Sequence, residues 1–177
     1  MCHAKKKIVF DPELCVGCGA CVVACMDQND TLFNESSENC CPNRRLVRAE
    51  FGQFPHASIR FASVSCMHCE DPACVTGCPT GALQKDPATG AVICNKNLCI
   101  GCHSCAMACP FGVPRYDIRG KITKCDQCHL RVAAGYEPAC VAICQTKALK
   151  FVELDEYQEQ IEAKKNQMLL NTRGSSR

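Results

Sequence analysis

Residues 99–110 read Cys99-Ile-Gly-Cys-His-Ser-Cys-Ala-Met-Ala-Cys-Pro110. The four cysteines of this stretch have the spacing C-x2-C-x2-C-x3-C, and a proline follows the last of them directly. Three related groups of four cysteines lie before and after it. The four groups, in chain order, are Cys15, Cys18, Cys21 and Cys25; Cys66, Cys69, Cys74 and Cys78; Cys99, Cys102, Cys105 and Cys109; and Cys125, Cys128, Cys140 and Cys144. They include most of the 20 cysteines of the chain.

The central stretch has the ligand spacing of bacterial ferredoxins. In that arrangement three closely spaced thiolates bind three irons of a [4Fe–4S] cluster, and the fourth cysteine is a ligand of a second cluster. One such stretch therefore implies a pair of clusters. Four groups of four cysteines predict four [4Fe–4S] clusters, with all of these cysteines as iron ligands.

The composition supports a structural role for the clusters. The chain has 177 residues but only 7 Phe, 3 Tyr and no Trp. Large apolar side chains are therefore scarce, and small domains with a marginal core usually depend on disulfides, metals or oligomerisation.

The start of the chain argues against a secreted, disulfide-linked scaffold. The residues after Met1 are polar and lysine-rich and lead directly into an Asp-Pro turn, with no apolar segment of a signal peptide. No apolar run reaches the ~18–20 residues of a membrane span. We therefore expect a soluble, cytoplasmic protein without direct membrane insertion, in which reduced cysteines indicate metal.

The charge of the chain is nearly balanced. Its formal net charge is +2, and its basic residues form no stripe of the kind that binds nucleic acid. We expect no nucleic-acid partner.

Most of the expected elements are short. Patterning and turn residues predict strands at 7–10, 46–51 and 58–64, a helix over about 21–27, and a surface excursion between residues 28 and 45. The turn at 86–90 predicts a hairpin, and the eleven residues between Cys128 and Cys140 suit a helical excursion ended by Gly135. Residues 111–124 read as a connector.

The end of the chain repeats an earlier pattern. Residues 144–152 (C-Q-T-K-A-L-K-F-V) resemble residues 78–85 (C-P-T-G-A-L-Q-K), which indicates an internal duplication. By this analogy residues 148–153 form a strand, which we expect to pair with residues 7–10. Residues 154–170 read as a helix that either packs on its own domain or serves as an assembly or homo-oligomerisation arm.

The four groups, their order, and the phrases C-M-H-C-E-D-P-A-C and C-P-T-G-A-L resemble the dimethyl-sulfoxide-reductase-type iron–sulfur subunit family over about residues 6–154. The resemblance implies an α+β fold of two intertwined bacterial ferredoxin-like modules, each with two [4Fe–4S] clusters, short β-hairpins and short helices, plus a C-terminal helix. Residues 1–65 and 119–154 would form the outer module, residues 66–118 the inner module, and residues 155–177 the helical tail.

The resemblance also implies how the cysteines pair. Each cluster takes three cysteines of one group and the last cysteine of its partner group. The implied sets are Cys15, Cys18, Cys21 with Cys144; Cys125, Cys128, Cys140 with Cys25; Cys66, Cys69, Cys74 with Cys109; and Cys99, Cys102, Cys105 with Cys78. Proline follows Cys78 and Cys109 but neither Cys25 nor Cys144, so the outer clusters lack it. All sixteen positions are cysteine, and we expect no [3Fe–4S] centre.

The implied function is electron transfer without catalysis. The chain has no dinucleotide-binding glycine motif, P-loop or nucleophile elbow. Members of the family relay single electrons for a molybdenum- or tungsten-pterin catalytic subunit. The expected partner in anaerobic metabolism is a formate dehydrogenase or CO2 reductase, with a hydrogenase or a second polyferredoxin subunit at the other end. The alternative is a tungsten aldehyde oxidoreductase or a carbon monoxide dehydrogenase.

Three other classes compete with this interpretation. A zinc-ribbon protein favours two C-x2-C knuckles with a longer spacer, which the C-x2-C-x2-C-x3-C spacing does not match. A disulfide scaffold would contain oxidised cysteines. A redox sensor would need an effector domain, which the chain lacks.

Some residues have two interpretations. His68 and His103 lie inside ligand loops and could be either cluster ligands or donors to a sulfur or a carbonyl, whereas His129 reads as a surface residue. Basic residues of the connector either form a docking face or are simply solvated: Arg115, Arg119, Lys121 and Lys124. Four spare cysteines lie outside the groups: Cys2, Cys40, Cys41 and Cys94. The adjacent pair Cys40 and Cys41 forms either an extra metal or redox site or two loop thiols without a role, and Cys94 reads as a small buried apolar residue.

Overall fold

The computed structural model describes residues 6–31 and 42–172. The described residues form several short helices, one longer C-terminal helix and four separate two-stranded antiparallel sheets. The three spare cysteines Cys2, Cys40 and Cys41 lie outside the described residues, as does most of the expected excursion between residues 28 and 45.

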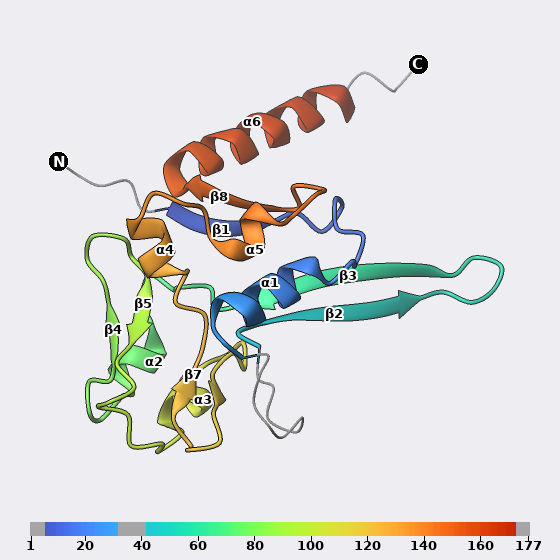
Figure 1. Cartoon of the computed structure of the whole chain (residues 1–177). Helices are drawn as coiled ribbons and strands as arrows, with labels where there is room; N and C mark the ends of the chain where they lie inside the picture. Colours follow the sequence, from blue (N-terminus) through green and yellow to red (C-terminus); the bar gives the residue numbers. More distant parts are fainter. Residues whose placement is uncertain (1–5, 32–41, 173–177) are drawn as a thin grey trace.

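The two ends of the described chain meet in one sheet. Strand β1 (Lys6–Phe10) pairs with β8 (Leu149–Glu153), with Ile8 opposite Phe151. The N–H of Asp11 donates to the carbonyl of Ala148 at 2.8 Å and continues the pairing past the end of β1. The predicted pairing of residues 7–10 with 148–153 is confirmed (Figure 1).

The longest sheet is a hairpin that extends away from the helices (Figure 1). It pairs β2 (Arg44–Phe51) with β3 (Ser58–Ser65). Its base is buried at Arg44 and Ser63, whereas Phe51 and Ile59 toward its tip are exposed. Strand β2 begins at Arg44, two residues before the predicted strand and inside the predicted excursion.

Two small hairpins follow along the chain. The turn at residues 86–90 joins β4 (Leu83–Lys85) to β5 (Val92–Cys94), as predicted. Within the expected connector, β6 (Arg115–Tyr116) pairs with β7 (Ile122–Thr123). Strands of two residues are too short to show an alternating pattern, and for this reason the sequence did not reveal the second hairpin. Leu83, Val92 and Ile122 pack in one core between these hairpins.

The helices that carry the cysteines pack in pairs. Helix α1 (Ala20–Gln28) contacts α5 (Ala139–Ala142), and α2 (Ala73–Thr76) contacts α3 (Ser104–Ala108). Helix α4 (His129–Ala133) occupies the segment between Cys128 and Cys140, and the chain leaves it through Gly135 at φ +85°, as predicted.

The predicted C-terminal helix is present as α6 (Leu154–Thr172), directly after β8. Leu154, Tyr157 and Ile161 are partly buried along it. Over the residues that the structure describes, no helix combines the length and the apolar character that crossing a membrane requires.

Candidate metal centres

The four cysteine groups begin with loops of the same backbone shape. In each loop the residue before the second cysteine has a positive φ: Gly17 (+72°), His68 (+46°), Gly101 (+71°) and Gln127 (+65°). This left-handed residue turns the chain between the first two cysteines. Glycine adopts the conformation at little cost, whereas other residues need support from their surroundings.

His68 and Gln127 receive that support from buried hydrogen bonds. The Nδ1 atom of His68 accepts a hydrogen bond from the N–H of Val92 at 2.8 Å. The Nε2 atom of Gln127 donates to the carbonyl of Lys6 at 2.9 Å. Both side chains are buried, and each ties its loop to a strand far away in the sequence. Sequence reasoning missed Gln127, although its place before the second cysteine was a usable signal.

Cys99, Cys102 and Cys105 lie with Cys78 around one cavity, which is also lined by Tyr116. The N–H of Ile122 donates to the Sγ of Cys99 at 3.5 Å. The hydroxyl of Tyr116 lies 3.3 Å from the Sγ of Cys105.

The last cysteine of the third group lies among the thiols of the second. Burial raises the pKa of Cys74, and the negative charges of Cys66, Cys109 and Cys69 raise it further. Electrostatic coupling of this kind requires short distances. The packing of α2 against α3 brings these two groups together.

The last cysteine of the first group lies among the thiols of the fourth. Burial raises the pKa of Cys25 to about 12, and the charges of Cys140 and Cys128 act in the same direction. Cys25 is located on α1 and Cys140 on α5, which pack together. Cys21 and Cys144 in turn pack on the same small core as Leu149 and Phe10.

The internal duplication extends to the details of the backbone. The hydroxyls of Thr80 and Thr146 lie 3.7 and 3.8 Å from the Sγ atoms of Cys78 and Cys144. Gly81 and Lys147, the third residues after these cysteines, both have positive φ.

The same turns hold the two thiols in an environment that favours the thiolate. Burial acts to raise the pKa of Cys78 and of Cys144, but hydrogen bonds from the backbone N–H groups of Leu83 and Leu149 and from nearby hydroxyls outweigh it, and both pKa values are lowered. A lowered pKa favours the thiolate, which is the form that binds iron.

The three histidines within the cysteine groups have different surroundings. Burial lowers the pKa of His68 to about 3, and its Nδ1 acts as an acceptor, so its Nε2 carries the proton. That Nε2 has no hydrogen-bond partner among the described residues. His103 stacks on Tyr116 with ring centroids 3.7 Å apart. His129 is partly exposed, and its Nδ1 lies 2.7 Å from a carboxylate oxygen of Asp126.

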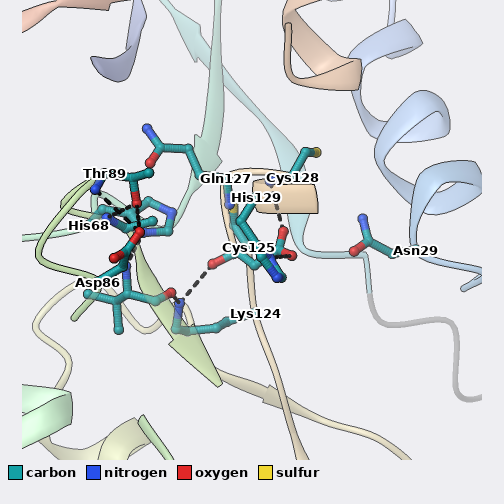
Figure 2. Close-up of polar contacts among 12 residues, drawn as sticks. Asn29, His68, Asp86, Thr89, Lys124, Cys125, Gln127, Cys128 and His129 are labelled. Atoms are coloured by element: carbon teal, nitrogen blue, oxygen red, sulfur yellow. Dashed lines mark hydrogen bonds and ion pairs between the residues drawn. The ribbon is translucent and has the colours of Figure 1, made fainter. Parts of the chain in front are cut away.

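Two basic side chains are buried beside the cysteines. Arg44 is 2 % exposed and bonds Ser63 and Ser65, and its charge acts on Cys25 and Cys140. Lys124, for which the sequence offered only a docking or a solvated role, is 6 % exposed. Figure 2 shows its ammonium bonded to the carbonyl of Cys125. The solvated and docking interpretations are therefore both wrong for Lys124, because the fold of residues 124–128 turns it inward.

The geometry fits [4Fe–4S] clusters better than the competing groups. All described cysteines are free thiols, so no disulfide scaffold is present among them. No three described His, Cys, Asp or Glu side chains are close enough to hold a single ion. A zinc site needs its sulfurs about 3.8 Å apart, from Zn–S bonds of about 2.3 Å, whereas a cubane separates its thiolates over four irons. The N–H groups of Ile122 and Gln127 are directed at the Sγ atoms of Cys99 and Cys125, and hydrogen bonds of this kind to cluster sulfurs tune the cluster potentials.

Cys94 lies outside the four groups. It is partly buried on β5 and packs against the core that contains Leu83. Burial and the charge of Cys99 raise its pKa to about 11. These properties agree with the prediction of a small apolar residue at this position.

Comparison with known proteins gives two matches to family models. A 4Fe-4S dicluster domain matches residues 57–154, and a 4Fe-4S binding domain matches residues 7–29. The first match contains the second, third and fourth cysteine groups, and the second match contains the first group.

Similar proteins include three curated relatives. The B subunit of the anaerobic dimethyl sulfoxide reductase of Haemophilus influenzae is 44% identical over 157 residues, which cover 83% of this chain and 73% of the relative. The protein of the same description from Escherichia coli K12 is 40% identical over 156 residues, with the same coverage. Protein NrfC of Escherichia coli K12 is 40% identical over 157 residues, which cover 87% of this chain and 68% of the relative.

Proposed function

The chain belongs to the 4Fe-4S dicluster family that includes the B subunits of anaerobic dimethyl sulfoxide reductases, and from this premise we propose a specific set of ligands, an order of the clusters and a catalytic partner. The protein is a non-catalytic electron-transfer subunit that carries four [4Fe–4S] clusters.

The ligands that we propose follow the cross-pairing of groups. They are Cys15, Cys18, Cys21 with Cys144 for the first cluster; Cys125, Cys128, Cys140 with Cys25 for the second; Cys66, Cys69, Cys74 with Cys109 for the third; and Cys99, Cys102, Cys105 with Cys78 for the fourth. The cavity shared by Cys78 with Cys99, Cys102 and Cys105 supports the fourth set, and the thiol neighbours of Cys74 and Cys25 support the third and second.

We propose that the four clusters lie in a series in the order in which they are numbered above, from the first to the fourth. The first and second sets share the packed helices α1 and α5, and the third and fourth share α2 and α3. Lys124 joins the two pairs, because its Nζ contacts both the carbonyl of Cys125 and the Sγ of Cys66. In the described chain, Cys18 and Cys102 are the exposed cysteines.

The exposure of Cys18 and Cys102 is the observation that best supports an electron relay. The two exposed thiols belong to the first and the fourth set, so each end of the series opens toward solvent, where a redox partner can approach. Bound [4Fe–4S] clusters supply one-electron carriers with potentials set by their surroundings. The protein residues hold the carriers in line and shield the middle of the series.

The catalytic partner that we propose is a molybdenum- or tungsten-pterin subunit. The names of the relatives support a reductase complex as the setting. A formate dehydrogenase or CO2 reductase remains our first proposal, with a hydrogenase or a second polyferredoxin at the other end, and a tungsten aldehyde oxidoreductase or carbon monoxide dehydrogenase as the alternative. The outer module (1–65 with 119–154), the inner module (66–118), an assembly role for residues 155–177 and a cytoplasmic location belong to the same proposal.

The ligand sets are tested by whether iron losses add. Replacing Cys109 by serine and Cys74 by serine together should cost no more than one cluster, about four irons, because both are ligands of the third cluster. Replacing Cys109 and Cys105 together should cost two clusters, about eight irons. Iron and acid-labile sulfide per chain are measured after anaerobic purification, with Cys94→Ser as the control that leaves the iron unchanged. Additive losses for the Cys109 and Cys74 pair would reject the cross-pairing.

The partner is tested by elemental analysis of the native assembly isolated through this chain. Molybdenum or tungsten together with about sixteen irons from this chain would support the pterin partner. Nickel in their place would favour carbon monoxide dehydrogenase or a nickel hydrogenase. Zinc in place of iron would reject the cluster assignment.

A further inference from the structure

Lys124 is a buried cation at the junction between the two halves of the series. Its Nζ donates to the carbonyl of Cys125 at 2.8 Å (Figure 2). It also donates to the carbonyl of Val92 and to the Sγ of Cys66 at 3.9 Å. An ammonium group has three N–H bonds and no lone pair. All three neighbours are acceptors, which matches the charged form of the lysine.

This charge has no carboxylate partner within the described part of the chain. The ion pairs there involve other residues, and the nearest acid of the same loop, Asp126, is engaged with the N–H of Cys128 and with His129. A buried ammonium without a counter-charge is costly. Two backbone carbonyls offset part of this cost, and the remaining compensation must come from the thiolates that lie around the amine.

Those thiolates come from two different ligand sets. Cys66, whose Sγ the amine contacts, belongs to the proposed third set. Cys125, whose backbone carbonyl the amine contacts and on whose thiol its charge acts, belongs to the proposed second. No other described basic residue contacts both sets: Arg44, the other buried cation, acts on Cys25, Cys125 and Cys140, all of which belong to the second set.

We propose that Lys124 is a positioning residue of the electron relay, whose fixed positive charge raises the reduction potentials of the second and third clusters together. The proposal rests on the ligand sets given above. Reduction adds one negative charge to a cluster, and a cation nearby stabilises the reduced form more than the oxidised form. A charge shared by both clusters shifts the two potentials in the same direction, so it makes both clusters easier to reduce and leaves the driving force between them nearly unchanged.

The test measures the potential of every cluster in variants of Lys124. The holoprotein is purified anaerobically as wild type, Lys124→Met, Lys124→Gln, Lys124→Arg and Lys150→Met. Lys150 is exposed on β8, so its replacement removes the same charge where water screens it. Each protein is titrated electrochemically, and the clusters are followed by EPR.

The expected result is selective. In Lys124→Met and Lys124→Gln, two of the four clusters should become harder to reduce, by at least tenfold in the reduction equilibrium constant, which is about 59 mV for a one-electron couple. The other two should stay near the wild-type values. Lys124→Arg should restore most of the lost potential, and Lys150→Met should change none of the four.

Three results would overturn the proposal. If the cluster potentials of Lys124→Met and Lys124→Gln equal those of the wild type, the charge of Lys124 has no effect on the clusters. A shift confined to one cluster would mean that Lys124 does not join the two pairs. Loss of iron from both neutral variants would mean that the amine holds the loop and does not tune the clusters. A wild-type protein without four clusters would instead reject the proposed function, so the two failures are distinguishable.

Discussion

Gly101, between the first two cysteines of the central stretch, has almost no space for a side chain. Its φ is +71°, and a Cβ built there would lie 2.6 Å from the carbonyl oxygen of Gly120. Gly120 has nearly the same φ, +70°, but a Cβ at Gly120 meets nothing within 4 Å. Gly101→Ala and Gly120→Ala therefore form a matched pair: both strain the backbone, and only the first also forces two loops apart.

The expected magnitudes follow from this difference. The left-handed conformation costs an alanine about 1–2 kcal/mol, so Gly120→Ala should lose about that much stability. Displacing the Gly120 carbonyl adds about 1–3 kcal/mol for overpacking, so Gly101→Ala should lose about 2–5 kcal/mol. For a chain of this size one kcal/mol corresponds to roughly 2–4 °C in Tm. The extra loss in Gly101→Ala should therefore be roughly 2–12 °C.

The assay is thermal bleaching of the iron–sulfur absorbance near 400 nm, recorded anaerobically at one fixed scan rate. Loss of the clusters is irreversible, so the comparison uses apparent midpoints at the same rate. We expect both variants to bind full iron at low temperature and Gly101→Ala to bleach first. Equal midpoints for the two variants would refute the reasoning, because the close approach to Gly120 would then carry no cost.

Three further predictions concern the surroundings of the clusters. Tyr116→Phe removes the hydroxyl that lies 3.3 Å from the Sγ of Cys105. Loss of a hydrogen bond of about 0.5–1.5 kcal/mol should lower the reduction potential of the cluster bound by Cys105 by about 20–60 mV. Redox titration followed by EPR measures this potential, and an unchanged value would contradict the prediction. Leu83→Ala and Leu149→Ala each truncate a side chain that is 2 % exposed. Each should lower the free energy of unfolding by about 2–5 kcal/mol, which bleaching at a lower temperature would reveal. A loss of stability below about 1 kcal/mol would contradict the assignment of these leucines to the two hydrophobic cores. The pKa of Cys94 is raised to about 11, so its contribution to stability is complete below pH 9.0 and is lost as the pH rises toward 11. Its alkylation in the native protein, followed by peptide mapping, should accordingly be slow at pH 8 and accelerate toward pH 11; rapid alkylation at pH 8 would contradict the burial.

Local features of the fold were predictable because their determinants are close together in the sequence. The turn at residues 86–90 and the helix after Cys18 depend on neighbouring residues, and the structure contains both. The pairing of residues 7–10 with the last strand was also predictable, but only through the duplication of residues 78–85 near the end of the chain.

Other features of the fold could not be predicted from the sequence because no local pattern encodes them. Strands β6 and β7 have two residues each, and their pairing depends on the core around Ile122. The pairing of β2 with β3 joins segments that the sequence indicated only as separate strands. Gln127 adopts a conformation that glycine has in two sister loops, and it does so because the distant carbonyl of Lys6 accepts its side-chain hydrogen bond.

The number and kind of the clusters could be read from the spacing of the cysteines, because that spacing is a local property of the chain and three of the four ligands of each proposed set come from one group. The surroundings of those cysteines, in contrast, depend on how distant parts of the chain pack. Lys124 reads in the sequence as one more basic residue of a connector, yet folding buries it against Val92, Cys125 and Cys66. The reason is physical: burial and the partners of a charge depend on which distant segments the fold packs together, and the spacing of residues along the chain does not specify that.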